Sequence, residues 1–194
     1  MKLFNIYDVS EVKVEDPGLR RYINLDARLL LKSKGRHVEK FGKAKVHIVE
    51  RLINELSVPG HRGKKHKVMT KVSGKYTREA NVVLETFKMI AERTKENPVQ
   101  ILVRAIENAS PKDEITTIEY GGARYPQAVD IAPLRRISLA LRNIVHGAHD
   151  KAFGKKKDIQ ETLANELILA SQGSNESFAV TKKIEIQKQA DSAR

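Results

Sequence analysis

The histidine side chains offer the most reactive chemistry in this sequence, but their spacing completes neither a metal site nor a catalytic one. His146, His149 and Asp150 stand together in the run HGAHD. Two histidines three positions apart on a helix can share a metal ion, yet Gly147 lies between them and no HExxH or carboxylate pattern supplies the remaining ligands. We therefore expect no metal here, and we expect these histidines to pack internally or to contact nucleic acid.

A fragment of phosphate-binding chemistry lies at Gly60, Gly63 and Lys64, which resemble part of a nucleotide-binding loop. The spacing G-x-x-x-x-G-K-[ST] that such a loop needs is missing, so nucleotide hydrolysis is not expected. No Ser–His–Asp arrangement and no paired carboxylates stand out elsewhere in the sequence. The sequence therefore predicts a protein that is not an enzyme and that needs no cofactor.

Positive charge separates this sequence from that of an ordinary soluble domain. Among its 194 residues, 36 Lys and Arg stand against 24 Asp and Glu, which leaves a net charge of +12. The first 80 residues hold 19 of the basic and 9 of the acidic side chains, so most of the excess lies there. A concentrated excess of this kind predicts a polyanionic partner, either nucleic acid or an anionic membrane.

The cellular location is also indicated by composition. Cysteine is absent, so disulfides and thiolate metal sites are excluded and the reducing cytosol is the expected compartment. No apolar run approaches the ~20 residues that a transmembrane helix needs. The first seven residues lack the core of a signal peptide. We expect a cytoplasmic protein that is not embedded in a membrane.

The basic residues of the first half fall in two neighbouring stretches. A helix predicted from an apolar stripe over 38–57 carries Lys40, Lys43 and Arg51 on its opposite face. The loop over 62–78 holds seven Lys or Arg and no acid. Such a loop is either a solvated charge run or a segment that follows a phosphate backbone. The interspersed glycines and histidines favour the second interpretation.

Arg135 and Arg136 form a third basic feature. They follow Pro133, which opens a predicted helix, so both lie in its first turn. Positive charge in that position opposes the helix macrodipole, which suggests that a phosphate shares the helix N-terminus with the two arginines. The alternative is a pair of solvated arginines, and the sequence leaves both open.

Hydrophobic periodicity and capping residues predict a mainly α protein of about six helices. Thr77 is expected as the N-cap of the second helix, and Asn97 with Pro98 begins the third. Asp158 and Glu161 have the spacing of a capping box at the start of the fifth. The predicted helices span 38–57, 77–91, 97–109, 133–153, 158–172 and 177–191.

The clear β signal lies at 111–133. β-branched and aromatic residues stand on both sides of Gly121 and Gly122, and two glycines supply the positive φ of a tight hairpin turn. Pro126 cannot donate to a ladder, so its strand needs a free edge. A two-stranded ribbon is marginal alone in water. We therefore expect a protruding hairpin between the third and fourth helices that leans on the helical body or on a partner.

The tip of this hairpin carries Arg124 between Tyr120 and Tyr125. Aromatic rings beside an arginine can stack on bases, and they can equally pack across strands.

The whole chain, 1–194, is expected to form a single domain. Its residues 1–36 are expected to form an extended basic N-terminal arm.

Five long stretches match the pattern of one known family. They are DPGLRRYINL (16–25), GRHVEKFGKAKVHIVERLIN (35–54), NPVQILVRAIENASP (97–111), YGGARYPQAVDIAPLRRISLAL (120–141) and SFAVTKK (177–183). Together they resemble the universal small-subunit ribosomal protein seven family in its archaeal form, over nearly the whole chain. The segment 68–78 departs from that pattern. The family's fold, about six helices with a β-ribbon between the third and fourth, agrees with the elements predicted above.

This resemblance implies a structural constituent of the small ribosomal subunit. It implies direct binding to the 3′ major domain of the rRNA and nucleation of head assembly, beside neighbouring ribosomal proteins. The implied location is the subunit interface near the decoding centre and the exit-tRNA site, with the hairpin directed toward tRNA and mRNA. The residues implied to bind RNA are Arg36, Lys40, Lys43, Lys45, Arg62, Lys64, Lys65, Lys67, Arg124, Arg135 and Arg136.

A helical DNA-binding regulator that uses the hairpin as a wing is the main alternative. Winged-helix proteins place a basic recognition helix just before the wing. The helix predicted over 97–109 carries only Arg104 and Glu107 as charged residues, which argues against this class. A helical enzyme is a second alternative, and it lacks a site. The nucleic acid that co-purifies with the protein discriminates between these readings.

Overall fold

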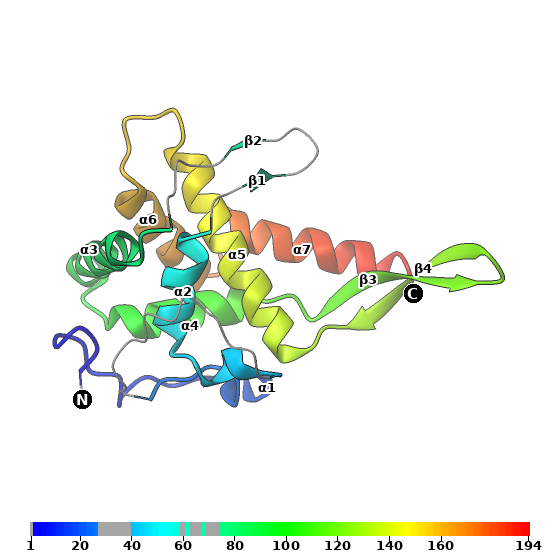
Figure 1. Ribbon diagram of the computed structural model, residues 1–194, viewed down its shortest axis with the longest axis horizontal. Helices are drawn as coiled ribbons and strands as arrows, with labels where there is room; N and C mark the ends of the chain where they lie inside the picture. Colours follow the sequence, from blue (N-terminus) through cyan, green and yellow to red (C-terminus); the bar gives the residue numbers. More distant parts are fainter. Residues whose placement is uncertain (1, 27–39, 59–60, 63–66, 69–73) are drawn as a thin grey trace.

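The computed structural model describes residues 2–26, 40–58, 61–62, 67–68 and 74–194. Within these residues the chain forms a helical body from which a two-stranded antiparallel hairpin extends (Figure 1). The predicted fold class is confirmed. The described part contains seven α-helices rather than about six, because a short additional helix begins at Pro17, directly after Asp16, in the N-terminal segment.

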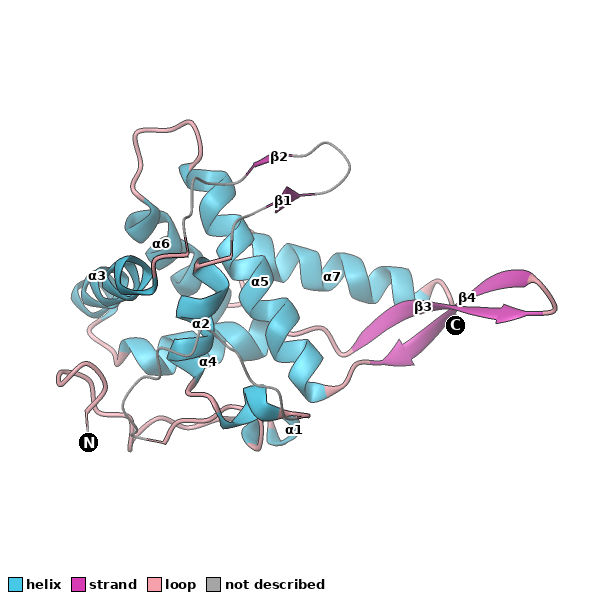
Figure 2. Cartoon of the chain, in the orientation of Figure 1, coloured by secondary structure: helices cyan, strands magenta, loops and turns pink. Residues whose placement is uncertain are grey.

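The α-helices in chain order are α1 (Pro17–Arg20), α2 (Ile48–Leu56), α3 (Tyr76–Thr94), α4 (Pro98–Ala109), α5 (Pro133–Ala152), α6 (Ile159–Ser171) and α7 (Phe178–Asp191), with a 3₁₀ turn, η1 (Gly42–Lys45), before α2. The strands, drawn in magenta in Figure 2, are β1 (His61–Arg62) with β2 (Lys67–Val68), and β3 (Asp113–Tyr120) with β4 (Ala123–Asp130). The hairpin of β3 and β4 therefore stands between α4 and α5.

The core lies where α4 meets α3, α5 and α6. α4 is buried on most of its circumference, and the side chains of Leu102, Val103 and Ile106 have no exposed surface. Its predicted start is confirmed, since the Asn97 side chain accepts a hydrogen bond from the backbone of the first turn and Pro98 follows it. Burial of each such side chain contributes about 1.5–3 kcal/mol, so α4 is the element on which its neighbours pack.

One helix start predicted from a capping residue is wrong, and at another helix the predicted start is right but the capping box does not form. α3 begins at Tyr76, and its N-cap is Lys75 without a capping side chain rather than Thr77. The buried Tyr76 hydroxyl donates a hydrogen bond to Glu50 of α2, so a contact between helices defines this start in place of a local cap. At α6 the N-cap is Asp158, as expected, but its side chain makes no capping bond and the predicted box does not form.

The helix predicted over 38–57 is shorter than its apolar stripe suggests. Phe41 has a positive φ of 63°, and Val46 has an extended backbone. An α-helix cannot pass through either conformation, so α2 starts at Ile48 and η1 occupies the space before it. The apolar stripe therefore predicts an α-helix correctly only over its second half, Ile48–Leu56.

The hairpin has the register that its two glycines predict. β3 and β4 pair over 8 residues each, and the turn lies at Gly121 and Gly122, where φ is +60° and +81°. Only glycine adopts such values at little cost, which explains the residue choice. Pro126 lies opposite Thr117 in the outer part of the ribbon. α7 packs against the root of β3, so the hairpin leans on the helical body there (Figure 1).

The N-terminal segment, predicted as an extended basic arm over 1–36, lies against the body where the structure describes it, in 2–26. Leu3 and Leu19 are buried in the core. The Glu107 carboxylate of α4 accepts hydrogen bonds from two successive backbone N–H groups of the segment, at 2.7 and 2.9 Å. The described part holds four Lys or Arg and five Asp or Glu, so the basic character of the segment comes from its remaining residues.

A buried carboxylate joins α5, α6 and α7. Glu166, whose side chain has no exposed surface, accepts hydrogen bonds from Lys151 at 2.6 Å and from Ser177 at 2.7 Å. Ser177 is the N-cap of α7, as its position in the sequence predicts. Gly147 lies directly against this group, since a Cβ there would stand 2.7 Å from the Cβ of Phe178 and 3.1 Å from Cδ of Glu166.

We predict that Gly147→Ala destabilises the protein, although alanine is the better helix former by about 1 kcal/mol. The added methyl group has no room unless α7 moves away from α5, and overpacking of this kind costs about 1–3 kcal/mol. Chemical denaturation followed by circular dichroism measures the free energy of unfolding. Lys88→Ala on the exposed side of α3 is the control for helix propensity alone. A variant more stable than the parent would contradict the packing described.

Candidate nucleic-acid interface

The first basic surface is formed by residues 40–45 and is termed the basic turn. Lys40, Lys43 and Lys45 are exposed on it. The ring of Phe41 is also exposed, and the Lys40 Nζ lies 5.4 Å from its centroid. Ammonium groups bind phosphates and exposed aromatic rings stack on bases. The structure thus brings three of the predicted RNA-binding residues together on one exposed turn.

Asn24 of the N-terminal segment holds the basic turn in place. Its side-chain amide donates a hydrogen bond to the backbone oxygen of Lys45 at 2.7 Å. Its backbone oxygen accepts a hydrogen bond from the Ile48 N–H at 3.0 Å. The backbone of the turn is therefore fixed before any partner binds, which lowers the ordering cost of binding.

His47 connects the basic turn to α2 and is buried, with 6% of its surface exposed. Its Nδ1 accepts a hydrogen bond from the Val49 N–H at 3.2 Å, and this bond caps α2. Burial lowers the pKa of His47 to about 4, against the opposing attraction of the Asp26 charge. The imidazole is therefore neutral near pH 7, and it serves the turn as a cap and not as a further cation.

Arg51, predicted on the exposed face of its helix with Lys40 and Lys43, is buried instead. Only 7% of its surface is exposed, and its guanidinium donates to the backbone oxygen of Tyr22 and to Ser138 Oγ of α5. The helical period places Arg51 off the apolar stripe of α2, and a single-helix pattern cannot show what packs there. In the structure this face of α2 lies against α5 and the N-terminal segment, which bury Arg51.

Arg135 and Arg136 at the start of α5 have different surroundings. Arg135 is exposed and forms a bidentate pair with Glu114 of β3, at 2.6 and 2.7 Å, and the hydrogen bonds to Glu114 raise the pKa of Arg135. The Arg136 side chain is 12% exposed and donates to Asp16 Oδ2 at 2.8 Å and to the backbone oxygen of Pro111 at 3.2 Å. The anion that the sequence suggested beside Arg136 is therefore supplied by the chain itself.

The Asp16 carboxylate is adapted to this pairing. Its burial acts to raise its pKa, but the hydrogen bonds from Arg136 and from the Gly18 N–H outweigh that effect and hold the pKa of Asp16 below its usual value. The carboxylate therefore stays ionised and keeps the guanidinium of Arg136 in place. Of the two arginines, Arg135 is the one exposed to a partner.

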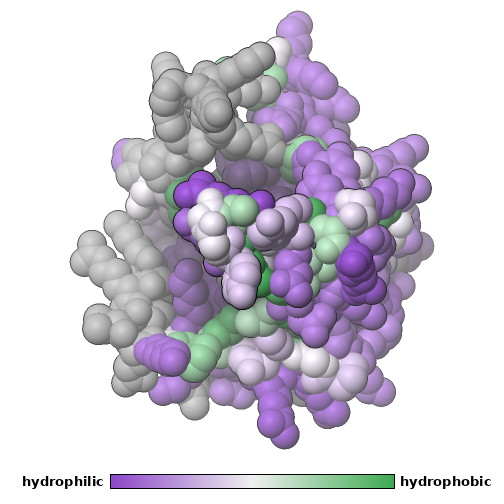
Figure 3. All heavy atoms as spheres, turned by 90° about the vertical axis from the view of Figure 1, so that its right-hand side faces the viewer, coloured by the Kyte–Doolittle hydropathy of each residue, from purple (hydrophilic) through white to green (hydrophobic). Residues whose placement is uncertain are grey.

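The hairpin tip is the surface that stands farthest from the body (Figure 1). Side chains alternate along a strand, so Ile118, Tyr120 and Tyr125 share one face while Glu119 and Arg124 lie on the other. Tyr120 is 81% exposed, and the Arg124 guanidinium stands 3.6 Å from the Glu119 carboxylate. Figure 3 looks onto the tip end-on and shows hydrophilic and near-neutral residues together in the foreground. The tip is thus weakly charged and partly aromatic.

Five predicted RNA-binding residues cannot be placed at the level of side chains. Arg36, Lys64 and Lys65 lie outside the described residues. Arg62 and Lys67 pair opposite each other in β1 and β2, where the backbone alone is described. Their contacts with RNA stay predictions.

These features define a class of protein before they define a family. Among the residues that the structure describes, no group of three or more His, Asp or Glu side chains is placed to hold a metal ion. None of the described helices combines the length and the apolar character that a bilayer crossing requires. Exposed cations on a fixed turn and an exposed ribbon are the features of a structural binding protein.

Comparison with known proteins gives the family. The family model described as ribosomal protein S7p/S5e matches residues 19–194. The chain is 50% identical over 196 residues to the small ribosomal subunit protein uS7 of Nanoarchaeum equitans (strain Kin4-M), covering 100% of this chain and 99% of that protein. It is 49% identical over 194 residues to the small ribosomal subunit protein uS7 of Methanothermobacter thermautotrophicus (strain Delta H), covering 98% of each. The chain belongs to the S7p/S5e family of ribosomal proteins in its archaeal form, as the sequence resemblance indicated, and this family is structural and not enzymatic.

We predict that His47→Asn removes part of the loss of stability in acid. The pKa of His47 is about 4 in the folded protein and about 6.5 in the unfolded chain, so its contribution is complete above the unfolded value and is lost as the pH falls toward the folded value. The parent should lose up to about 3 kcal/mol more than the variant between neutral pH and pH 4. Asparagine keeps the N-cap. Urea denaturation at a series of pH values measures the difference, and parallel curves would contradict a buried neutral imidazole.

We predict that Arg136→Met costs stability and that Arg135→Met, the same change at the next residue, does not. Loss of Arg136 leaves the half-buried Asp16 without its guanidinium, which costs about 2–3 kcal/mol. Arg135 is 58% exposed and pairs with Glu114 at the surface, so its loss costs less than about 1 kcal/mol. Denaturant unfolding of both variants measures the contrast. Equal losses would show that Arg136 has no special role in the fold.

Proposed function

We propose that this chain is a primary rRNA-binding protein of the small ribosomal subunit, acting in the cytoplasm. It binds the 3′ major domain of the rRNA directly and nucleates assembly of the subunit head, which neighbouring ribosomal proteins then join. In the assembled subunit it lies at the interface near the decoding centre and the exit-tRNA site. Family membership supports this proposal, and the basic turn is the structural observation that carries it.

The basic turn suits a primary contact with rRNA because its charge is exposed and its backbone is already fixed. Each phosphate that a lysine neutralises releases counterions, and the slope of log affinity against log salt changes by about −0.7 to −0.9 per contact. Folded RNA meets a protein on several surfaces, because helices and junctions surround it. Arg36, Arg62, Lys64, Lys65 and Lys67 extend the proposed surface from the same half of the chain, and Arg135 adds a separate contact at the start of α5.

The hairpin has a different role in this proposal. Residues 111–133 hold two basic and four acidic side chains, which is a poor composition for anchoring rRNA. The tip instead offers Tyr120 and Arg124, whose ring and guanidinium suit stacking and single phosphate contacts with a passing strand. We therefore place the hairpin toward tRNA and mRNA at the subunit interface, with the rRNA held by the body.

A DNA-binding regulator is disfavoured by the position of α4. This helix precedes the hairpin and would have to be the recognition helix of a winged-helix protein. Its residues Leu102, Val103 and Ile106 have no exposed surface, and it lies in the middle of the core. A helix in that position cannot enter a DNA groove without unfolding the protein.

We predict that Lys40→Gln combined with Lys45→Gln weakens binding to an rRNA fragment of the 3′ major domain and flattens its salt dependence. Loss of two phosphate contacts changes the slope of log affinity against log salt by about 1.4–1.8. The control is Lys88→Gln combined with Lys95→Gln, which removes the same charge from an exposed position of α3 and from its exposed C-cap. Filter binding over a range of salt concentrations measures both.

Two results would count against the proposal. One is an unchanged slope for the Lys40 and Lys45 variant, which would remove the basic turn from the interface. The other is binding of duplex DNA as tight as binding of the rRNA fragment at moderate salt. Nuclease protection on whole small-subunit rRNA then locates the contact, which is expected within the 3′ major domain.

A further inference from the structure

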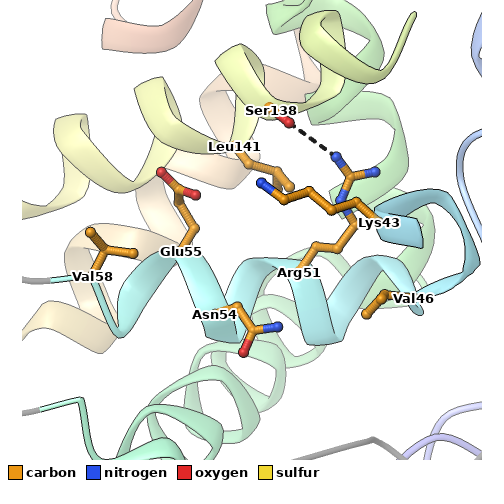
Figure 4. Close-up of a pocket in the computed structure, with 8 residues that line it drawn as sticks. All are labelled: Lys43, Val46, Arg51, Asn54, Glu55, Val58, Ser138 and Leu141. Atoms are coloured by element: carbon orange, nitrogen blue, oxygen red, sulfur yellow. Dashed lines mark hydrogen bonds between the residues drawn. The ribbon is translucent and has the colours of Figure 1, made fainter. Parts of the chain in front are cut away.

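A cleft of about 160 Å³ lies between α2 and α5, beside the basic turn (Figure 4). The side chains of Lys43 and Arg51 both extend into one end of it, while Glu55 lies farther along α2 (Figure 4). Val46 and Leu141 contribute apolar wall. The cleft therefore combines two cations with a partly apolar lining.

The guanidinium of Arg51 is poorly matched by its partners in the protein. It has five N–H donors. Within the described residues it donates to the backbone oxygen of Tyr22 at 3.4 Å and to Ser138 Oγ at 3.3 Å. Both distances are long for hydrogen bonds of a charged group, and both acceptors are neutral. Within the part of the chain that the structure describes, no carboxylate forms a hydrogen bond with this buried guanidinium.

The charge of Arg51 is also incompletely compensated. Burial lowers the pKa of Arg51 to about 10, and the attraction of Glu55 opposes this shift only in part. Glu55 stands 3.6 Å from Arg142 of α5, so its carboxylate is shared with a second arginine. Among the described residues that line the cleft, Lys43 and Arg51 stand against Glu55, and Glu55 also pairs with Arg142, so this part of the cleft carries net positive charge.

A buried charge without a close counter-ion lowers the stability of the folded protein. A long apolar side chain in the same place would fill the space between α2 and α5 without the desolvation cost of a guanidinium. Residues that bind ligands commonly lower the stability of the free protein in this way. The mismatch at Arg51 therefore points to an anion that is bound only in the complex.

We propose that this cleft receives one phosphate group of the rRNA backbone, held by the Arg51 guanidinium at its floor and the Lys43 ammonium at its rim. The planar fork of an arginine matches two phosphate oxygens, and a lysine adds a mobile point charge. The adjoining lysines of the basic turn favour RNA over an isolated carboxylate of a neighbouring protein. This inference rests on the proposed rRNA binding and names one contact within it.

The first test compares affinity and stability in the same variants. Arg51→Met should leave the melting temperature unchanged or raised, and should lower affinity for the rRNA fragment on the order of tenfold to a hundredfold. The affinity of Arg51→Lys should lie between those of the parent and of Arg51→Met, because lysine keeps the positive charge but lacks the planar pair of donors that a guanidinium offers. The control is Arg104→Met. It removes one arginine of α4, which pairs with Glu96 before that helix, and it should leave the affinity for the rRNA fragment unchanged.

The second test identifies the phosphate. Single neutral methylphosphonate linkages are placed along the protected part of the rRNA fragment, one for each RNA. At one linkage position, the methylphosphonate should weaken binding of the parent protein by as much as the Arg51→Met substitution weakens binding to unmodified RNA. The same modified RNA should bind Arg51→Met about as well as unmodified RNA does. Lys43→Gln changes an exposed side chain and should leave the fold intact. It should lose little affinity at the same linkage position, and it tests the phosphate site if Arg51→Met does not fold.

The outcomes separate this inference from the function on which it rests. If the parent binds the rRNA fragment with its full salt slope and both Arg51→Met and Lys43→Gln bind as tightly, the cleft is no phosphate site. Equal losses at every methylphosphonate position overturn it as well. Cross-linking of Lys43 to a neighbouring protein and not to rRNA in the assembled subunit would assign the cleft to a carboxylate. Failure of the parent to prefer the rRNA fragment overturns the proposed function itself.

Discussion

The ion pair between Arg136 and Asp16 joins the parts of the chain whose relative positions matter most. One guanidinium contacts the Asp16 carboxylate of the N-terminal segment at 2.8 Å and the backbone oxygen of Pro111, at the root of the hairpin, at 3.2 Å. Glu107 of α4 binds the backbone of the same N-terminal segment. That segment continues to Asn24, which fixes the basic turn. The direction of the hairpin and the position of the exposed lysines therefore depend on one shared junction.

The fold places the basic side chains of the protein in two kinds of surroundings, paired with acids or exposed together. Around the root of the hairpin, arginines are neutralised within the chain, since Arg136 pairs with Asp16 at 2.8 Å and Arg194 with Asp113 at 2.9 Å. On the basic turn the lysines are exposed. Paired charges at the surface add little to long-range attraction, whereas an exposed cluster of one sign attracts a polyanion and releases its counterions. A net charge of +12 thus describes the sequence, but its distribution separates a structural region from a binding region.

Local signals in the sequence predicted the elements that local chemistry determines. Two glycines specified the hairpin turn, and Asn97 and Ser177 specified the starts of α4 and α7. The errors arise where a distant residue decides. The start of α3 depends on the hydrogen bond from Tyr76 to Glu50, and Arg51 contacts Tyr22 and Ser138, which lie far from it along the chain. No periodicity carries that information, so the sequence predicted Thr77 as the N-cap of α3 and an exposed Arg51. The pairing of Arg136 with Asp16, 120 positions away, is equally absent from any periodicity, and RNA binding by Arg136 stays a prediction.

The regions proposed to meet RNA keep side chains that the isolated fold does not bury or pair closely. Tyr120 and Ile118 are exposed on a ribbon of two strands, which has little stability of its own, and among the described residues Arg51 has only two long hydrogen bonds to neutral acceptors. The core around α4 is by contrast fully packed, and Glu166 has partners for both carboxylate oxygens. The packed core supplies stability, and this lets the basic turn, the cleft and the hairpin keep side chains suited to a bound partner. The role proposed for this protein, to fold first and then organise RNA around itself, requires this separation.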